Sequence, residues 1–206
     1  MSTRARRCDG AVLLTALFVL VAILAIGVSA AQIALSAEKS ARNERDRHIA
    51  FQAAEAGLAD AERDIEGGAD PGSARAMLFE GGSVVGFVDG CGRDSANLGL
   101  CAHLPGAAAP AWQVAALSAP DGAGSPATPY GKFTGETLPT GGGALPARPP
   151  RYVIELLPLV RAGEDAGQRS DALYRITAIG FGALPGTQVV LQSFYRKAAP
   201  AHGSLQ

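Results

Sequence analysis

The sequence predicts an α+β protein in which one long N-terminal helix packs on an antiparallel β-sheet. Three features predict it: an apolar segment over residues 11–37, a helix-forming segment over residues 38–66, and three β-rich runs near the C-terminus. The 206 residues suffice for one domain and an appendage, but not for two ordinary domains. We therefore expect a helix with an apolar half and an amphipathic half, followed by a globular head at residues 67–206.

The segment from Ala11 to Ala37 contains no charged residue. Four of its residues are clearly polar: Thr15, Ser29, Gln32 and Ser36. As a helix it would span roughly 40 Å, more than the roughly 30 Å of a bilayer's hydrocarbon core. Arginines at positions 4, 6 and 7 precede it and are expected to keep the N-terminus in the cytoplasm. The sequence therefore predicts one membrane span, with the head on the opposite side.

Three processing outcomes are compatible with this segment. A secretory signal peptide would be cut after Ala30, although the apolar region before that site is longer than the usual stretch of about 7 to 15 residues. An uncleaved anchor would keep the whole N-terminus. Cleavage after Gly10 would leave the apolar helix on the mature chain, which would begin at Ala11.

Residues 38–66 have the composition of a continuous helix, since they lack proline and contain a single glycine, Gly57. Apolar side chains recur at spacings of three and four, which places them on one face. This stripe, which we expect to pack the helix on the head, consists of Phe51, Ala54, Leu58, Ala61 and Ile65. Gly67 and Gly68 predict the end of the helix.

The order of residues in this helix resembles the N-terminal signature of PilX-type minor pilins, which are subunits of bacterial type IV pili. The residues that carry the resemblance are Asn43, Arg45, Asp46, Phe51, Gln52, Glu55, Asp60 and Glu62. The Arg6-Arg7 pair followed by Gly10 and an apolar helix also resembles the leader of type IV prepilins. The resemblance implies that residues 1–10 are a leader, that a prepilin peptidase cuts after Gly10, and that the new N-terminus at Ala11 is methylated.

The resemblance further implies a structural subunit and not an enzyme, without a cofactor. The implied partners are other minor pilins, the major pilin, the prepilin peptidase, the inner membrane and a tip adhesin. The implied location is the inner membrane, with a cytoplasmic N-terminus and a periplasmic head, before incorporation in the pilus.

Two residues depart from the pattern of major pilins. If cleavage follows Gly10, Thr15 becomes the fifth residue, where major pilins usually carry glutamate, and Ala11 the first, where they carry phenylalanine. A carboxylate in a bilayer costs about 2.5 to 3.5 kcal/mol on insertion scales, so it needs a partner such as the N-terminus of the preceding subunit. We therefore expect a position in the tip or priming complex. Two alternatives stay open: a minor pseudopilin of type II secretion, and a membrane-anchored periplasmic binding module.

The head is predicted to contain an antiparallel meander near its C-terminus. Residues 151–160, 173–180 and 187–196 are β-rich runs bounded by Gly, Pro and Asp. Apolar side chains alternate along each run, so one face can cover the stripe of the helix. Two further short strands are expected at residues 83–88 and 112–117.

Cys91 and Cys101 follow the apolar segment and are therefore expected in a compartment where disulfides persist, whereas Cys8 precedes it. A bridge between Cys91 and Cys101 would stabilise the head by about 3 kcal/mol in the chain-entropy model. Two free thiols or a metal site are the alternatives, but only His103 lies nearby in sequence, which makes a poor zinc set.

No pattern of catalytic, cofactor-binding or metal-binding residues emerges from the sequence. The three histidines lie far apart, at positions 48, 103 and 202, and Glu155 and Glu164 read as isolated carboxylates. The net charge of −1 comes without a basic stripe, which argues against nucleic-acid binding.

Overall fold

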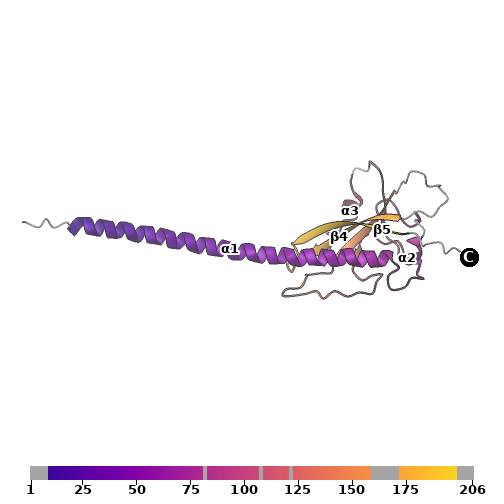
Figure 1. Ribbon diagram of the computed structural model, residues 1–206, viewed down its shortest axis with the longest axis horizontal. Helices are drawn as coiled ribbons and strands as arrows, with labels where there is room; N and C mark the ends of the chain where they lie inside the picture. The colour runs from indigo at the N-terminus through magenta and orange to yellow at the C-terminus, as the bar shows by residue number, and fades with distance from the viewer. Residues whose placement is uncertain (1–8, 81–82, 107–108, 121–122, 159–171, 199–206) are drawn as a thin grey trace, which may run out of the picture. The chain divides into compact units, whose positions relative to one another are not determined.

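A single long helix and one small sheet provide most of the regular structure (Figure 1). The structure is a computed structural model that describes residues 9–80, 83–106, 109–120, 123–158 and 172–198. Its elements are α1 (Asp9–Ile65), α2 (Ala74–Met77), β1 (Leu100–Ala102), α3 (Ala111–Val114), β2 (Thr128–Pro129), β3 (Arg151–Leu157), β4 (Ala172–Phe181) and β5 (Gln188–Lys197). The chain divides into two units, residues 1–45 and 46–206, which we describe separately.

In the first unit, every side chain of α1 from Ala11 to Arg45 is exposed. This part of α1 belongs to the one helix of the described chain that is long and apolar enough to cross a membrane. Its hydroxyl groups donate to the helix backbone: Thr15 Oγ1 lies 2.9 Å from the Val12 carbonyl, and Ser29 Oγ lies 2.8 Å from the Ala25 carbonyl. Hydroxyls satisfied in this way suit a helix surrounded by lipid.

In the second unit, residues 46–65 of α1 lie against a five-stranded sheet of order β1-β3-β4-β5, with β2 also paired to β3 (Figure 1). Strands β3, β4 and β5 form the antiparallel meander that the sequence predicts. Strand β1 joins β3 in parallel, so the whole sheet is mixed. The predicted α+β class, a long helix packed on a sheet, is confirmed.

The two faces of the sheet carry separate cores. The face toward α1 holds Tyr152 and Ile154 of β3 with Tyr174 and Ile176 of β4, packed with Ile65 of the helix. The opposite face, covered by the loops around α3, has its own buried cluster that includes Val153, Ile179, Phe181, Ala115, Leu117 and both head cysteines. Because successive side chains alternate between faces, covering both faces buries β3 and β4 almost continuously.

The helix backbone approaches β4 directly at Gly180. A Cβ placed on Gly180 would lie 2.1 Å from the Ala50 carbonyl oxygen and 2.3 Å from the Ala54 nitrogen. Ala50, Ala53 and Ala54 are all buried there. The small residues of both elements therefore permit a backbone-to-backbone contact that a larger side chain would separate.

Two predicted strands are wrong. Residues 112–117 form part of α3 and the turn after it, because Pro110 starts a short helix and the alanines favour helical geometry. Residues 83–88 are turns, with Gly86 at φ 89°, and only Val88 makes an isolated bridge, to Cys101. Strand β3 ends at Leu157, before Pro158, which has no N–H for the ladder; Val160, where the run was predicted to end, lies outside the described residues.

Candidate functional site at the junction of helix and head

The head-facing part of α1 carries three buried carboxylates. Asp46 is 6% exposed, and Asp60 and Asp64 are fully buried. A buried carboxylate is costly unless hydrogen bonds or an ion pair compensate it. Each of the three accepts hydrogen bonds from a different segment of the head, so together they attach the helix at three points. We call these residues the helix anchor.

Asp46 binds the turn between β4 and β5. Its Oδ1 accepts from the Leu184 N–H at 3.1 Å. Burial raises the pKa of this carboxyl, but the Thr187 hydroxyl and the Leu184 and Ala183 amides stabilise the charged form, so the pKa is lowered overall. A Cβ on Gly182 would lie 2.6 Å from Asp46 Oδ1, so the turn needs glycine there.

Asp60 binds the loop that follows β2. It accepts from the Gly131 N–H at 2.7 Å and from the Thr134 hydroxyl. Burial raises the pKa of Asp60, and the hydrogen bonds and the Arg63 charge offset this only in part. Asp60 thus organises a loop far away in sequence.

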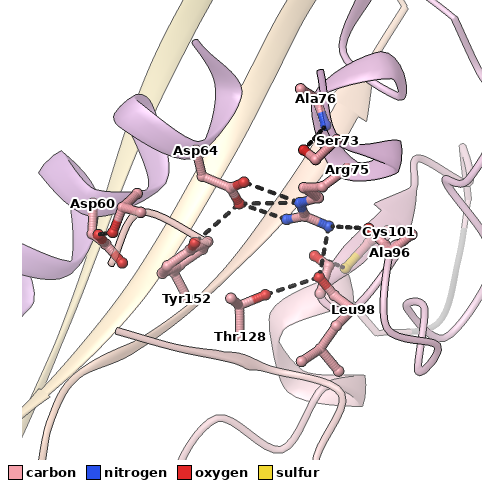
Figure 2. A network of polar contacts seen from close by, with 12 residues as sticks. Asp60, Asp64, Ser73, Arg75, Ala76, Ala96, Leu98, Cys101, Thr128 and Tyr152 are labelled. Carbon is pink, nitrogen blue, oxygen red and sulfur yellow. Dashed lines mark hydrogen bonds and ion pairs between the residues drawn. The ribbon is translucent and has the colours of Figure 1, made fainter. Parts of the chain in front are cut away.

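Asp64 forms a buried ion pair with Arg75, which is 4% exposed and comes from α2 (Figure 2). Arg75 Nε donates to Asp64 Oδ1 at 3.0 Å, and Nη2 donates to Oδ2 at 2.6 Å. The Tyr152 hydroxyl of β3 also donates to Asp64 Oδ2, at 3.0 Å. Burial, together with the Asp64 charge, raises the pKa of Tyr152 well above its usual 10.0. Helix, sheet and α2 therefore meet at one carboxylate.

The same guanidinium reaches the loop between Cys91 and Cys101. Arg75 Nη1 donates to the carbonyl oxygens of Ala96 at 3.1 Å and Leu98 at 2.9 Å (Figure 2). Cys91 and Cys101 form the predicted disulfide, which closes that loop. Arg75 thus links the disulfide loop to the helix anchor.

The predicted packing stripe is partly displaced. Ala54, Ala61 and Ile65 are buried, and Leu58 packs against the core from a half-buried position. Phe51 must be corrected, because its side chain is 40% exposed. The close contact of the α1 backbone with β4 leaves no room for an aromatic ring between them, so small side chains occupy the buried face.

The residues of the family signature divide into two groups. Asp46 and Asp60 are buried and belong to the helix anchor. The others are exposed or half-buried: Asn43, Arg45, Phe51, Gln52, Glu55 and Glu62. Gly10 and Ala11 lie in the first turn of α1.

Sequence reasoning missed Asp64 and Arg75. The signal available for Asp64 was its spacing: it follows Asp60 by four residues and so shares the buried side of the helix. Arg75 offers no comparable signal, because it lies in a short helix whose position depends on the folded head.

Glu155 is not the isolated carboxylate that the sequence indicated. On the sheet face away from α1, Glu155 Oε1 lies 2.7 Å from His103 Nδ1, and Glu155 Oε2 accepts from Arg175 Nε at 3.0 Å. These residues border a pocket of about 240 Å³. Both carboxylate oxygens are thus engaged, and among the described residues no group of three His, Cys, Asp or Glu side chains is placed to hold a metal.

Comparison with known families gives two matches. Residues 10–59 match the model described as PilX N-terminal, and residues 94–197 match the type IV pilus assembly protein PilX C-term model. The second covers half of the chain and includes the meander. No curated protein and no solved structure matches the chain. PilX proteins are structural minor pilins, which suits a single N-terminal apolar helix joined to a firmly anchored head. The chain belongs to the PilX family of type IV pilus assembly proteins.

Proposed function

We propose that this protein is a structural minor pilin that assembles in the tip or priming complex of a type IV pilus and carries out no catalysis. The observation that carries the position is Thr15. Its hydroxyl donates to the Val12 carbonyl, so the side chain at this place in the apolar helix is neutral and already satisfied. A subunit without a carboxylate here does not need the N-terminal ammonium of a preceding subunit. This property suits the first subunit of a filament, which has no preceding subunit.

The proposed maturation follows the division of the chain. A prepilin peptidase removes residues 1–10, and Ala11 becomes the methylated N-terminus. Residues 11–37 cross the inner membrane, and residues 38–66 continue the helix into the periplasm. The head, residues 67–206, remains attached to that helix through the helix anchor and leaves the membrane with it when the pilus forms.

The proposed partners are the other minor pilins and the major pilin, with a tip adhesin as a further partner of the head. The fully exposed apolar surface of α1 in the first unit is the natural contact for other pilin helices. Its alanines and Gly27 permit close packing of helices in lipid.

Mass spectrometry of the mature N-terminal peptide tests the proposal most directly. The protein would be isolated from membranes of cells with and without active prepilin peptidase. We expect an N-methylated Ala11 that depends on the peptidase. A start at Ala31 would indicate a secreted protein, and an intact leader would indicate a plain anchored one; both results would contradict a pilin.

The position in the pilus needs a separate experiment. Immunogold labelling of sheared filaments should show the protein at one end only, and uniform labelling along the shaft would refute the tip position. Co-purification with type IV pilus components, compared with secretion components, would show which machine the protein serves. An exchange of residues 11–37 for an unrelated membrane span should abolish assembly; assembly with the foreign span would instead favour a membrane-anchored binding module.

A further inference from the structure

The pocket on the sheet face away from α1 is built from elements of the head alone. Its volume is about 240 Å³, which is below the roughly 300 to 1,000 Å³ of pockets that take drug-sized ligands. The sheet contributes Glu155 of β3 and Arg175 of β4 to its lining, and the rest comes from the segments before and after β1 and from α3. The pocket therefore has room for a small ligand.

Three polar side chains of this pocket hold one another in place. Glu155 is 4% exposed, and it lies opposite Arg175 in the register of β3 with β4. His103 directly follows β1 and contacts Glu155 Oε1 through its Nδ1, while Arg175 donates to Glu155 Oε2 through Nε and Nη2. Because a carboxylate only accepts hydrogen bonds, His103 Nδ1 carries the hydrogen of its contact. Glu155 thus fixes the orientation of the imidazole ring and of the guanidinium.

The contacts with Glu155 use only part of the hydrogen-bonding capacity of its two partners. A guanidinium has five N–H groups, and the bonds to Glu155 occupy two of those of Arg175. His103 Nε2 has no partner among the described residues, and it accepts a hydrogen bond when the ring is neutral. Asp89, an exposed residue that also lines the pocket, adds two carboxylate oxygens. The pocket therefore offers donors and acceptors together.

The charges around the pocket argue against a simple ion as its ligand. Glu155 already neutralises Arg175, and Asp89 adds a second carboxylate, so an anion would be repelled. A cation would lie beside a guanidinium whose remaining N–H groups it cannot satisfy. A neutral group with several hydroxyls meets both requirements, because each hydroxyl donates one hydrogen bond and accepts others.

Apolar side chains cover another part of the lining. Leu104 is 45% exposed and Val114 is 49% exposed, and both line the pocket. Phe194 of β5, 65% exposed, lies opposite Arg175 on the same face of the sheet. A ligand that removes these side chains from water needs an apolar surface as well as hydroxyls. A sugar ring has both, because its C–H groups form an apolar face.

We propose that this pocket binds one neutral sugar residue. Arg175 donates to the hydroxyl oxygens of the sugar, and the sugar hydroxyls donate to His103 Nε2 and to Asp89. The C–H face of the ring packs on Val114. Glu155 is a positioning residue, because it acts through the two side chains that it orients. This binding goes beyond the structural role proposed above, and it depends neither on prepilin processing nor on the tip position.

Saturation-transfer NMR of the full-length protein tests the proposal. The protein is kept in lauryldimethylamine oxide, a detergent without sugar, at neutral pH. The probes are the methyl glycosides of glucose, galactose, mannose and N-acetylglucosamine, with acetate and ethylammonium as the anionic and cationic probes. We expect transfer to the ring protons of at least one glycoside and to neither ion. Transfer to an ion and to no glycoside, or transfer to no probe at all, would overturn the proposal.

Two matched pairs of variants locate the binding. Val114→Trp fills the pocket without changing its polar side chains and should abolish binding, whereas Val84→Trp, at a residue that is 73% exposed and outside the lining, should retain it. Asp89→Ala removes one acceptor and should weaken binding about tenfold. Asp94→Ala, at another exposed aspartate, should leave binding unchanged. An intact disulfide and an unchanged circular dichroism spectrum would show that the variants are folded, and full binding by Val114→Trp would overturn the proposal.

A tetrasaccharide of the sugar that binds distinguishes a free sugar from a glycan chain as the source. Equal affinity for the glycoside and the tetrasaccharide would support a site for a single free sugar. Tighter binding of the tetrasaccharide would support a site for one residue of a longer glycan. Loss of transfer with the tetrasaccharide in the Val114→Trp variant is expected in both cases, and its persistence would contradict this pocket as the site.

Discussion

Among single residues of the described chain, Arg75 joins several segments that are distant in sequence. Its guanidinium contacts Asp64 and the Ala96 and Leu98 carbonyls, and it lies over the Phe133 ring at 4.1 Å. A cation so placed leaves several buried groups unsatisfied when it is removed. At the scale of single residues, we therefore expect the free energy of unfolding of the head to depend on buried charges more than on the volume of the core.

The first prediction is a double-mutant cycle on the buried ion pair. Arg75→Met should lower the free energy of unfolding of the head by about 3 to 5 kcal/mol, because it leaves Asp64 buried and uncompensated. The double variant R75M/D64L should cost clearly less than the sum of the two single changes. Urea unfolding gives the four free energies, and additive values would contradict the ion pair.

The control for this cycle is Arg63→Met, which removes the ion pair of Arg63 with Glu136. Both side chains are 47% exposed, so solvent screens their attraction. We expect a loss of about 0 to 1 kcal/mol. A loss as large as that of Arg75→Met would mean that burial does not distinguish the two pairs.

The second prediction concerns pH. Because the pKa of Asp46 is lowered in the folded head from the usual 3.8, its charged form stabilises the head above pH 3.8, and this contribution is lost as pH falls through the lowered pKa. Asp46→Asn should therefore destabilise the head most near neutral pH, and the difference from the parent should shrink toward about pH 3. Unfolding free energies across this range provide the measurement. Asp70→Asn, at an exposed position, should cost much less than Asp46→Asn near neutral pH.

Among the elements, the contact of α1 with β4 determines how the head is built. The third prediction is that Gly180→Ala lowers the unfolding free energy by about 1 to 3 kcal/mol, because its Cβ would meet backbone atoms of α1 and not a movable side chain. Amide exchange of residues 46–65 should become faster. Gly186→Ala, with nothing within 4 Å of its Cβ, is the matched control and should leave exchange in α1 unchanged.

The helix and the meander could be predicted because their signals are local. Residues 38–66 lack proline and repeat apolar residues at helical spacing, and β4 alternates apolar and polar residues from Tyr174 to Ala178. The helix anchor could not be predicted to the same extent. Asp64 and Arg75 are brought together only by the fold. Phe51 was assigned to the core because of its spacing along the helix, and spacing alone does not reveal the backbone contact at Gly180. Strand β1 was missed because it has only three residues and its strand partner, β3, is distant in sequence.

At the scale of the whole molecule, the disulfide and the helix anchor belong to one connected structure. The fourth prediction is that C91A/C101A lowers the unfolding free energy of the head by about 3 kcal/mol. The change should also speed amide exchange of α1 near Asp64, because the loop that holds Arg75 becomes less ordered. Hydrogen exchange with mass spectrometry would detect this, and unchanged exchange near Asp64 would show that loop and helix are independent.

The spacing of the three anchoring carboxylates has a mechanical consequence. Asp46 and Asp64 are separated by roughly 27 Å along the helix, with Asp60 between them. A force applied along the helix axis loads all three attachments in shear at the same time, whereas a force that peels the helix away would break them one by one. A pull along the helix is therefore resisted by the summed strength of all three attachments, whereas a peeling force meets only one of them at a time.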